Sequence, residues 1–165
     1  MRKKILWLTE TAAMLALLIA LQWATKPAGQ LVTGSCVNAV LAMSVVVTGL
    51  SSGLTVAILS PVFAYLLGIA PNLLAVPAIM AGNALFVTAL KLLDGRQLWK
   101  KALAWLTAAA AKFAAIYVLV AWLICGFNVG AFPAAFSWPQ LVTALIGGGI
   151  AIVMAIPVKK AIHRR

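Results

Sequence analysis

Acidic residues are nearly absent from this 165-residue chain, which has only Glu10 and Asp94. Histidine occurs once, as His163 in the basic C-terminal tail, and the two cysteines, Cys36 and Cys125, lie apart within apolar segments. Acid–base catalysis needs positioned ionisable groups, and a metal centre needs a cluster of histidine, cysteine or carboxylate ligands. The sequence therefore predicts neither an enzyme nor a bound metal or cofactor. It also contains no phosphate-binding loop with which the chain itself would hydrolyse ATP.

Charged residues of either sign are scarce as well. They make up 9% of the chain and apolar residues 65%, against about 25% and 45–50% in a typical soluble domain. A chain this short has too little interior to remove so much apolar surface from water. The composition excludes a soluble globular domain and a disordered chain. It predicts an all-α integral membrane protein in contact with lipid.

Six apolar runs predict six transmembrane helices in a single domain of residues 1–165. The helices are expected at about residues 5–24, 34–50, 53–69, 72–93, 98–125 and 138–158. A spanning helix needs roughly 17–25 residues, so the second and third runs, separated only by Ser51 and Ser52, are short. They are interpreted as a tight helical hairpin or as including a partly re-entrant segment. No small-residue cleavage site follows the first run, so we expect a helix there rather than a cleaved signal peptide.

Basic residues are distributed unequally between the two ends of these helices. With both termini inside, all 13 lysine and arginine residues except Lys26 and Lys112 fall on the inner side. Cytoplasmic segments of membrane proteins are enriched in these residues, so the pattern predicts an N-in/C-in orientation. Because the cations flank apolar runs, the net charge of +11 indicates membrane topology rather than binding to nucleic acid.

Lys112 is the most informative single residue, because it lies in the middle of the fifth apolar run. It follows Lys101 by 11 residues, or about 16 Å at 1.5 Å per residue, which places the ammonium near the bilayer midplane. A cation at that depth costs at least about 2.5–3.5 kcal/mol and needs compensation. Two interpretations remain open. The ammonium is the counter-ion of an anionic substrate group, or it forms a structural ion pair with Glu10 of the first helix.

Polar residues in other apolar runs are expected in the outer half of the same bundle. Asn83 lies near mid-depth in the fourth run, where Pro77 predicts a kink that frees backbone carbonyls. Asn38 lies near the outer end of the second helix, and Ser60-Pro61 predicts a break in the third. Taken singly, each is more typical of hydrogen bonding between helices than of contact with a ligand. Their convergence favours a binding site.

Loop residues complete the candidate site. Gln30 and Thr33 are expected in the loop before the second helix, and Asn128 in the loop after the fifth, where it would contact a ligand from a lid. The candidate substrate-binding residues are therefore Gln30, Thr33, Asn38, Asn83, Lys112 and Asn128.

Small side chains form a stripe along the first helix. Ala12, Ala16 and Ala20 recur every four residues and so lie on one helix face. Such a stripe allows another helix to approach closely. That helix belongs either to the same bundle or to a partner protein, and the spacing alone is compatible with both.

Two longer stretches and the overall layout carry a family resemblance. Residues 30–38, QLVTGSCVN, and residues 60–69, SPVFAYLLGI, are similar to segments of the substrate-binding S components of energy-coupling factor (ECF) transporters. The six helices, the N-in/C-in orientation and the alanine repeat on the first helix also resemble that family. The resemblance covers the whole chain in topology, and it implies a multi-pass protein of a prokaryotic plasma membrane.

The resemblance also implies partners and a ligand. The alanine stripe would contact a separate transmembrane coupling subunit, which is bound to two ATPase subunits. Gln30, Thr33 and Asn38 would lie at a pocket near the outer face for a vitamin or a similar small water-soluble micronutrient. The alternative is a small integral-membrane scaffold or assembly subunit without a substrate of its own, in which Lys112 is a structural ion-pair partner.

Overall fold

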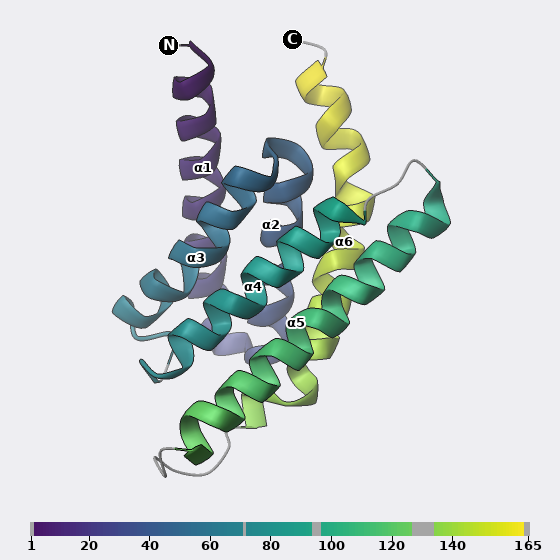
Figure 1. The fold of residues 1–165 in the computed structure, drawn as a ribbon. Coiled ribbons are helices and arrows are strands. Elements are labelled where there is room, and N and C mark those ends of the chain that lie inside the picture. The colour runs from purple at the N-terminus through teal and green to yellow at the C-terminus, as the bar shows by residue number, and fades with distance from the viewer. Residues whose placement is uncertain (1, 71, 94–96, 127–133, 164–165) are drawn as a thin grey trace.

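The computed structural model describes residues 2–70, 72–93, 97–126 and 134–163, a part of the chain that contains helices and no strand (Figure 1). Six α-helices account for most of it, and two short 3₁₀ helices, η1 and η2, lie before α2 and α6. In chain order the elements are α1 (Arg2–Thr25), η1 (Lys26–Ala28), α2 (Gln30–Thr48), α3 (Leu50–Leu66), α4 (Ala75–Leu92), α5 (Leu98–Gly126), η2 (Ala134–Phe136) and α6 (Trp138–His163).

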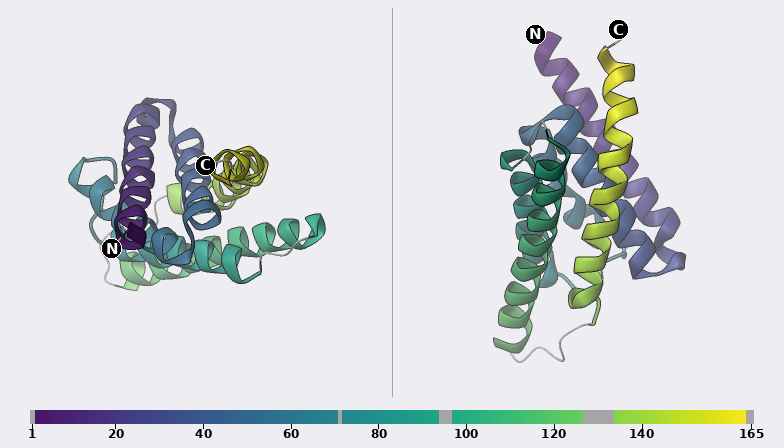
Figure 2. Two further views of the ribbon diagram at one scale, coloured as in Figure 1. Left: turned by 90° about the horizontal axis from the view of Figure 1, so that it is seen from above. Right: turned by 90° about the vertical axis from the view of Figure 1, so that its right-hand side faces the viewer.

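Successive helices run in opposite directions, so the two ends of the described chain lie at the same end of the bundle (Figures 1 and 2). The turn between α2 and α3 lies toward that end, and η1 and η2 lie at the other. Helix α2 is central, because it packs against α1, α3, α4 and α6, whereas α5 packs mainly against α4 and α6. The end that carries η1 and η2 is called the cavity end below.

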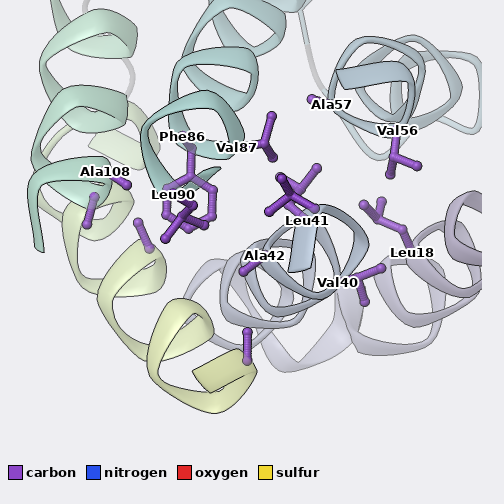
Figure 3. Packing of buried hydrophobic residues seen from close by; sticks show 14 residues of the cluster. Leu18, Val40, Leu41, Ala42, Val56, Ala57, Phe86, Val87, Leu90 and Ala108 are labelled. Atoms are coloured by element: carbon purple, nitrogen blue, oxygen red, sulfur yellow. The ribbon is translucent and has the colours of Figure 1, made fainter. Parts of the chain in front are cut away.

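The core draws on all six helices. Leu41 of α2 lies at its centre, between Leu18 and Val56 on one side and Phe86 and Val87 on the other (Figure 3). All five side chains are fully buried. Small residues let the helices approach this closely: a Cβ at Gly147 of α6 would lie 2.5 Å from the Asn38 Cβ of α2. Close contact through glycine and alanine is typical of helix packing in membranes.

Five of the helices, α1, α2, α4, α5 and α6, are long and apolar enough to cross a bilayer. Helix α3 is also apolar but has 17 residues, or about 26 Å at 1.5 Å per residue. Large apolar side chains cover the outside of the bundle, and Leu8, Trp23 and Val153 are each more than 60% exposed. Long apolar helices with an apolar exterior are those of a multi-pass membrane protein.

Helix α2 begins four residues earlier than the sequence analysis predicts. Gly29 precedes it with φ of 88°, a left-handed value that glycine adopts without a steric penalty, and the Thr33 amide donates to the Gly29 carbonyl at 3.1 Å. Placing Gln30 and Thr33 in a loop is therefore wrong. Both residues lie in the first turn of α2, which fixes the positions of their side chains.

The turn between α2 and α3 is also displaced from its expected place. It consists of Gly49, whose φ is 98°, so Ser51 and Ser52 lie in the first turn of α3 rather than between the helices. Ser51 accepts a hydrogen bond from the Trp7 indole at 3.0 Å, and Ser52 accepts one from the Thr11 hydroxyl at 2.9 Å. These two serines thus attach α3 to α1 near the end that carries the N-terminus.

Neither proline has the expected effect on its helix. Pro61 lies inside α3, which nevertheless continues to Leu66, so the predicted break at Ser60-Pro61 is wrong. Pro77 is the third residue of α4. Backbone N–H groups in the first turn of a helix have no intrahelical acceptor, so proline at this position costs no hydrogen bond and does not free a carbonyl in the way the sequence predicts.

Candidate functional site

A cavity of about 140 Å³ lies at the cavity end, among α2, α4, α5 and the segments that close this end. Five of the six candidate residues named from the sequence line it, although they come from three helices. The sixth, Asn128, lies outside the described residues. Two further amides, which the sequence analysis missed, belong to the same wall. The polar residues that line the cavity are Gln22, Gln30, Thr33, Asn38, Asn83, Lys112 and Gln140.

Lys112 is buried in the middle of α5, with 2% of its surface exposed. Its Nζ donates a hydrogen bond to Oδ1 of Asn38 and lies 5.4 Å from the centre of the Phe86 ring. The buried alanines Ala108 and Ala109, one turn earlier on α5, leave room for the neighbouring helices. A neutral amide oxygen and an aromatic face compensate the ammonium only in part, because neither carries a full negative charge.

Asn38 connects three helices. Its Nδ2 donates to the Gly34 carbonyl at 2.9 Å and to the Thr143 hydroxyl of α6 at 3.2 Å, while its Oδ1 accepts from Lys112. Thr143 in turn donates to the Gln140 carbonyl at 3.1 Å. The Asn38 side chain is thereby fixed from both sides, and its carbonyl oxygen is held toward α5.

Glu10 is not the hydrogen-bond partner of Lys112. Helix α1, which carries Glu10, packs against α2 and α3, and Glu10 is only partly buried. The buried ammonium instead donates to Asn38. The ion-pair interpretation of Lys112 is therefore wrong, and within the described chain no carboxylate lines the cavity.

Two amide oxygens of the cavity wall have no hydrogen-bond partner within the described residues. They are Oδ1 of Asn83 and Oε1 of Gln22. Asn83 is 1% exposed, and its Nδ2 makes only a long contact of 3.4 Å to the Ala57 carbonyl. A buried polar atom without a partner costs about 1–3 kcal/mol. Such atoms are uncommon in folded proteins, and a water, an ion or a ligand in the cavity would supply the missing donors.

The remaining predicted residues occupy the rim. Gln30 is exposed, whereas Thr33 is buried and donates through its hydroxyl to the Thr25 carbonyl at 2.8 Å. The segment after α3 also reaches the cavity, through Ile69 and Ala70. Lys26 of η1 donates to the Gly68 carbonyl at 2.8 Å and so joins the two loops that border the opening.

Gln22 and Gln140 had a detectable signal in the sequence. Each is an amide within the outer turn of an apolar run, at the depth where Gln30 and Thr33 were selected. An amide near the membrane boundary is usually explained by solvation, so only the packing of α1 and α6 around α2 brings these two residues to the cavity.

The alanine stripe of α1 lies on the outside of the bundle. Ala12, Ala16 and Ala20 are all exposed, and the last two form a shallow apolar groove together with Trp23 and Leu67. Packing inside this bundle therefore does not explain the stripe. The face is open to lipid or to another protein.

Comparisons of the chain with protein-family models, with curated proteins and with solved structures give no match. Function therefore has to be inferred from the cavity and from the exposed faces themselves.

Proposed function

We propose that this chain is the membrane-embedded substrate-binding subunit of an uptake system of the ECF type, and that its substrate is a vitamin or a similar small water-soluble molecule. The observation that carries the proposal is the buried ammonium of Lys112 at the wall of a partly open cavity, without a carboxylate beside it among the described lining residues. Ionisable groups inside the membrane are expensive, and by default they mark substrate or ion pathways.

The rest of the wall is consistent with a small-molecule site. Apolar residues such as Val37, Ile79 and Phe136 surround a few amides, and ligand sites are mostly apolar with a small number of placed polar groups. A scaffold subunit has no need of unpaired amide oxygens at a cavity. The buried polar groups thus favour binding over the scaffold alternative.

A binding subunit with no ATP-binding motif needs partners to drive transport. The exposed alanine stripe on α1 is a suitable contact for the transmembrane coupling subunit, because small side chains permit close approach of a second helix. Two ATPase subunits bound to the coupling subunit would supply the energy. In this arrangement, substrate and partner use separate surfaces of the chain.

The proposed orientation places both termini in the cytoplasm of a prokaryotic cell, since nearly all lysine and arginine residues then lie inside. The cavity would open toward the outer face. A single cysteine introduced at Gly95, in a background without Cys36 and Cys125, should be labelled by a membrane-impermeant maleimide only after the cells are opened. Labelling in intact cells would contradict the orientation.

Equilibrium binding to the purified protein tests the function itself. The panel contains water-soluble vitamins, each measured with the unmodified protein and with Lys112→Met, and Lys101→Met serves as a control at the inner end of the same helix. Saturable binding of one vitamin that Lys112→Met weakens and Lys101→Met does not would support the proposal. A folded protein that binds no member of the panel would favour the scaffold subunit.

A further inference from the structure

Hydrogen-bonding groups of opposite kinds face the cavity. An ammonium has three N–H donors. In the structure, Lys112 uses one of them in its hydrogen bond to Asn38. Asn83 Oδ1 and Gln22 Oε1 are acceptors without a donor among the described residues. The wall therefore offers donors at α5 and acceptors at α4 and α1, which a ligand must match with both an acceptor and a donor.

The donor and acceptor groups lie on adjacent helices. Gly82, the residue before Asn83, is buried, and a Cβ there would lie 3.3 Å from the Lys112 carbonyl. Glycine at this point thus allows α4 and α5 to approach closely beside the cavity. Because Asn83 and Lys112 also line the same cavity, a single small molecule can contact both side chains.

Charge restricts the ligand further. Lys112 is the only ionisable residue among the described residues that line the cavity. A ligand anion supplies the countercharge that Asn38 and Phe86 lack, whereas a ligand ammonium would add a second cation without any carboxylate to compensate it. The group that donates to Asn83 is therefore a neutral N–H or O–H.

Size gives the last restriction. The cavity of about 140 Å³ is smaller than the roughly 300–1,000 Å³ of sites for drug-sized ligands. We infer that the cavity binds a single-ring or similarly small anion with a neutral N–H or O–H group, the anion facing Lys112 and the N–H or O–H facing the oxygens of Asn83 and Gln22. This inference rests on the proposed function and names the substrate class of the same site.

Matched probe pairs test the inference on the purified full-length protein. Orotate and 6-hydroxynicotinate each carry a carboxylate and a ring N–H, and 1,3-dimethylorotate and the N-methyl derivative of 6-hydroxynicotinate keep the carboxylate without that N–H. Uracil has the N–H groups without the anion, and thiamine is a cation. We expect at least one N–H carboxylate to bind about ten- to a hundredfold more tightly than its methylated partner, since a buried acceptor is otherwise left unpaired.

Two variants show whether Asn83 causes the preference for an N–H carboxylate over its methylated partner. In Asn83→Leu, which has a similar volume and no acceptor, the preference for the N–H member of a pair should fall by at least about threefold, since only the Gln22 oxygen remains as an acceptor. Ser60→Ala is the matched control, because the Ser60 hydroxyl is also buried without a partner among the described residues but is not part of the described cavity lining. It should keep the full preference. A melting temperature measured without ligand verifies that both variants are folded.

Three outcomes would overturn the inference. Equal binding of a probe and its methylated partner would remove the donor requirement, and tighter binding of thiamine or uracil than of any carboxylate would remove the anion requirement. In both cases the chain still binds a small molecule and the proposed function stands. Absence of binding by every probe also overturns the inference, and the separate vitamin panel then decides whether the proposed function fails with it.

Discussion

The cavity and the outer face of α1 differ in their side chains: the cavity buries polar residues, and the outer face of α1 exposes small apolar ones. At the cavity, the polar side chains of Asn38, Asn83 and Lys112 are removed from solvent, whereas on α1 the small apolar side chains of Ala12 and Ala16 are exposed. Burial of a polar group costs free energy unless the group forms a hydrogen bond or an ion pair. Exposure of alanine in lipid costs little and leaves a smooth surface. The contrast favours ligand binding at the first region and protein contact at the second.

If the two regions have separate roles, a change in one should leave the other unaffected. The largest effect is expected from Ala16→Trp. Its indole would fill the groove beside Ala20 and Trp23 and prevent close approach of a partner helix. Uptake in cells that contain the proposed coupling and ATPase subunits should fall to background, while ligand affinity of the isolated protein stays within about threefold, since the cavity wall is untouched.

Leu17→Trp is the control for Ala16→Trp. Leu17 is 48% exposed on the neighbouring face of the same helix, so the added bulk enters lipid rather than the groove. This variant should keep uptake. If Ala16→Trp and Leu17→Trp lower uptake equally, the groove has no special role and the comparison between the two regions fails.

The next largest effect is expected at the cavity itself. Lys112→Met removes the charge and keeps most of the side-chain volume. A hydrogen bond to a charged group contributes about 1.5–3 kcal/mol, and 1.4 kcal/mol corresponds to tenfold in affinity. Ligand binding should weaken by about ten- to a hundredfold, whereas the melting temperature should stay level or rise, because a buried cation is removed. Unchanged affinity measured by calorimetry would exclude Lys112 from the site.

Asn38→Leu tests how much the hydrogen bond between Asn38 and Lys112 contributes to stability. The change removes the oxygen to which Lys112 donates and leaves a buried cation with only the Phe86 ring. We expect a loss of about 1.5–3 kcal/mol in the free energy of unfolding, the usual contribution of a hydrogen bond to a charged group. Combining it with Lys112→Met should recover at least half of that loss. Thermal melts of the single and double variants measure this coupling, and strictly additive losses would argue against it.

The smallest effect is expected from Asn83→Ala. A neutral hydrogen bond contributes about 1 kcal/mol, so affinity should fall by about fivefold, less than for Lys112→Met. Stability without ligand should change little, since Asn83 Oδ1 has no partner among the described residues and Nδ2 makes only a 3.4 Å contact. If Asn83→Ala weakened binding more than Lys112→Met, then Asn83 rather than Lys112 would make the larger contribution to ligand affinity.

Much of this arrangement is readable from the sequence because lipid penalises polar groups. Long apolar runs predict α1, α4, α5 and α6 closely, and polar residues within such runs lead to Asn38, Asn83 and Lys112. Single glycines are harder to interpret. Gly29 and Gly49 set the ends of α2 through left-handed backbone conformations, which composition does not reveal.

The sequence alone does not predict which helices pack against each other. The depths of Lys112 and Glu10 allow an ion pair to be considered, but the choice of Asn38 as the partner follows from the packing of α1 mainly against α2 and α3 rather than against α5. Gln22 and Gln140 join the site for the same reason. Tertiary packing, rather than any local pattern, decides which polar residues meet.

If the cavity around Lys112 holds a small molecule, the protein should carry that molecule with it when it is purified from the membrane. Unmodified protein and Lys112→Met are purified in parallel from the same amount of cells, denatured, and their released small molecules are compared by mass spectrometry. The account predicts one small anionic species at close to one per chain in the unmodified protein and at least about tenfold less in the variant. Equal small-molecule content in the two samples, or none in either, would contradict it.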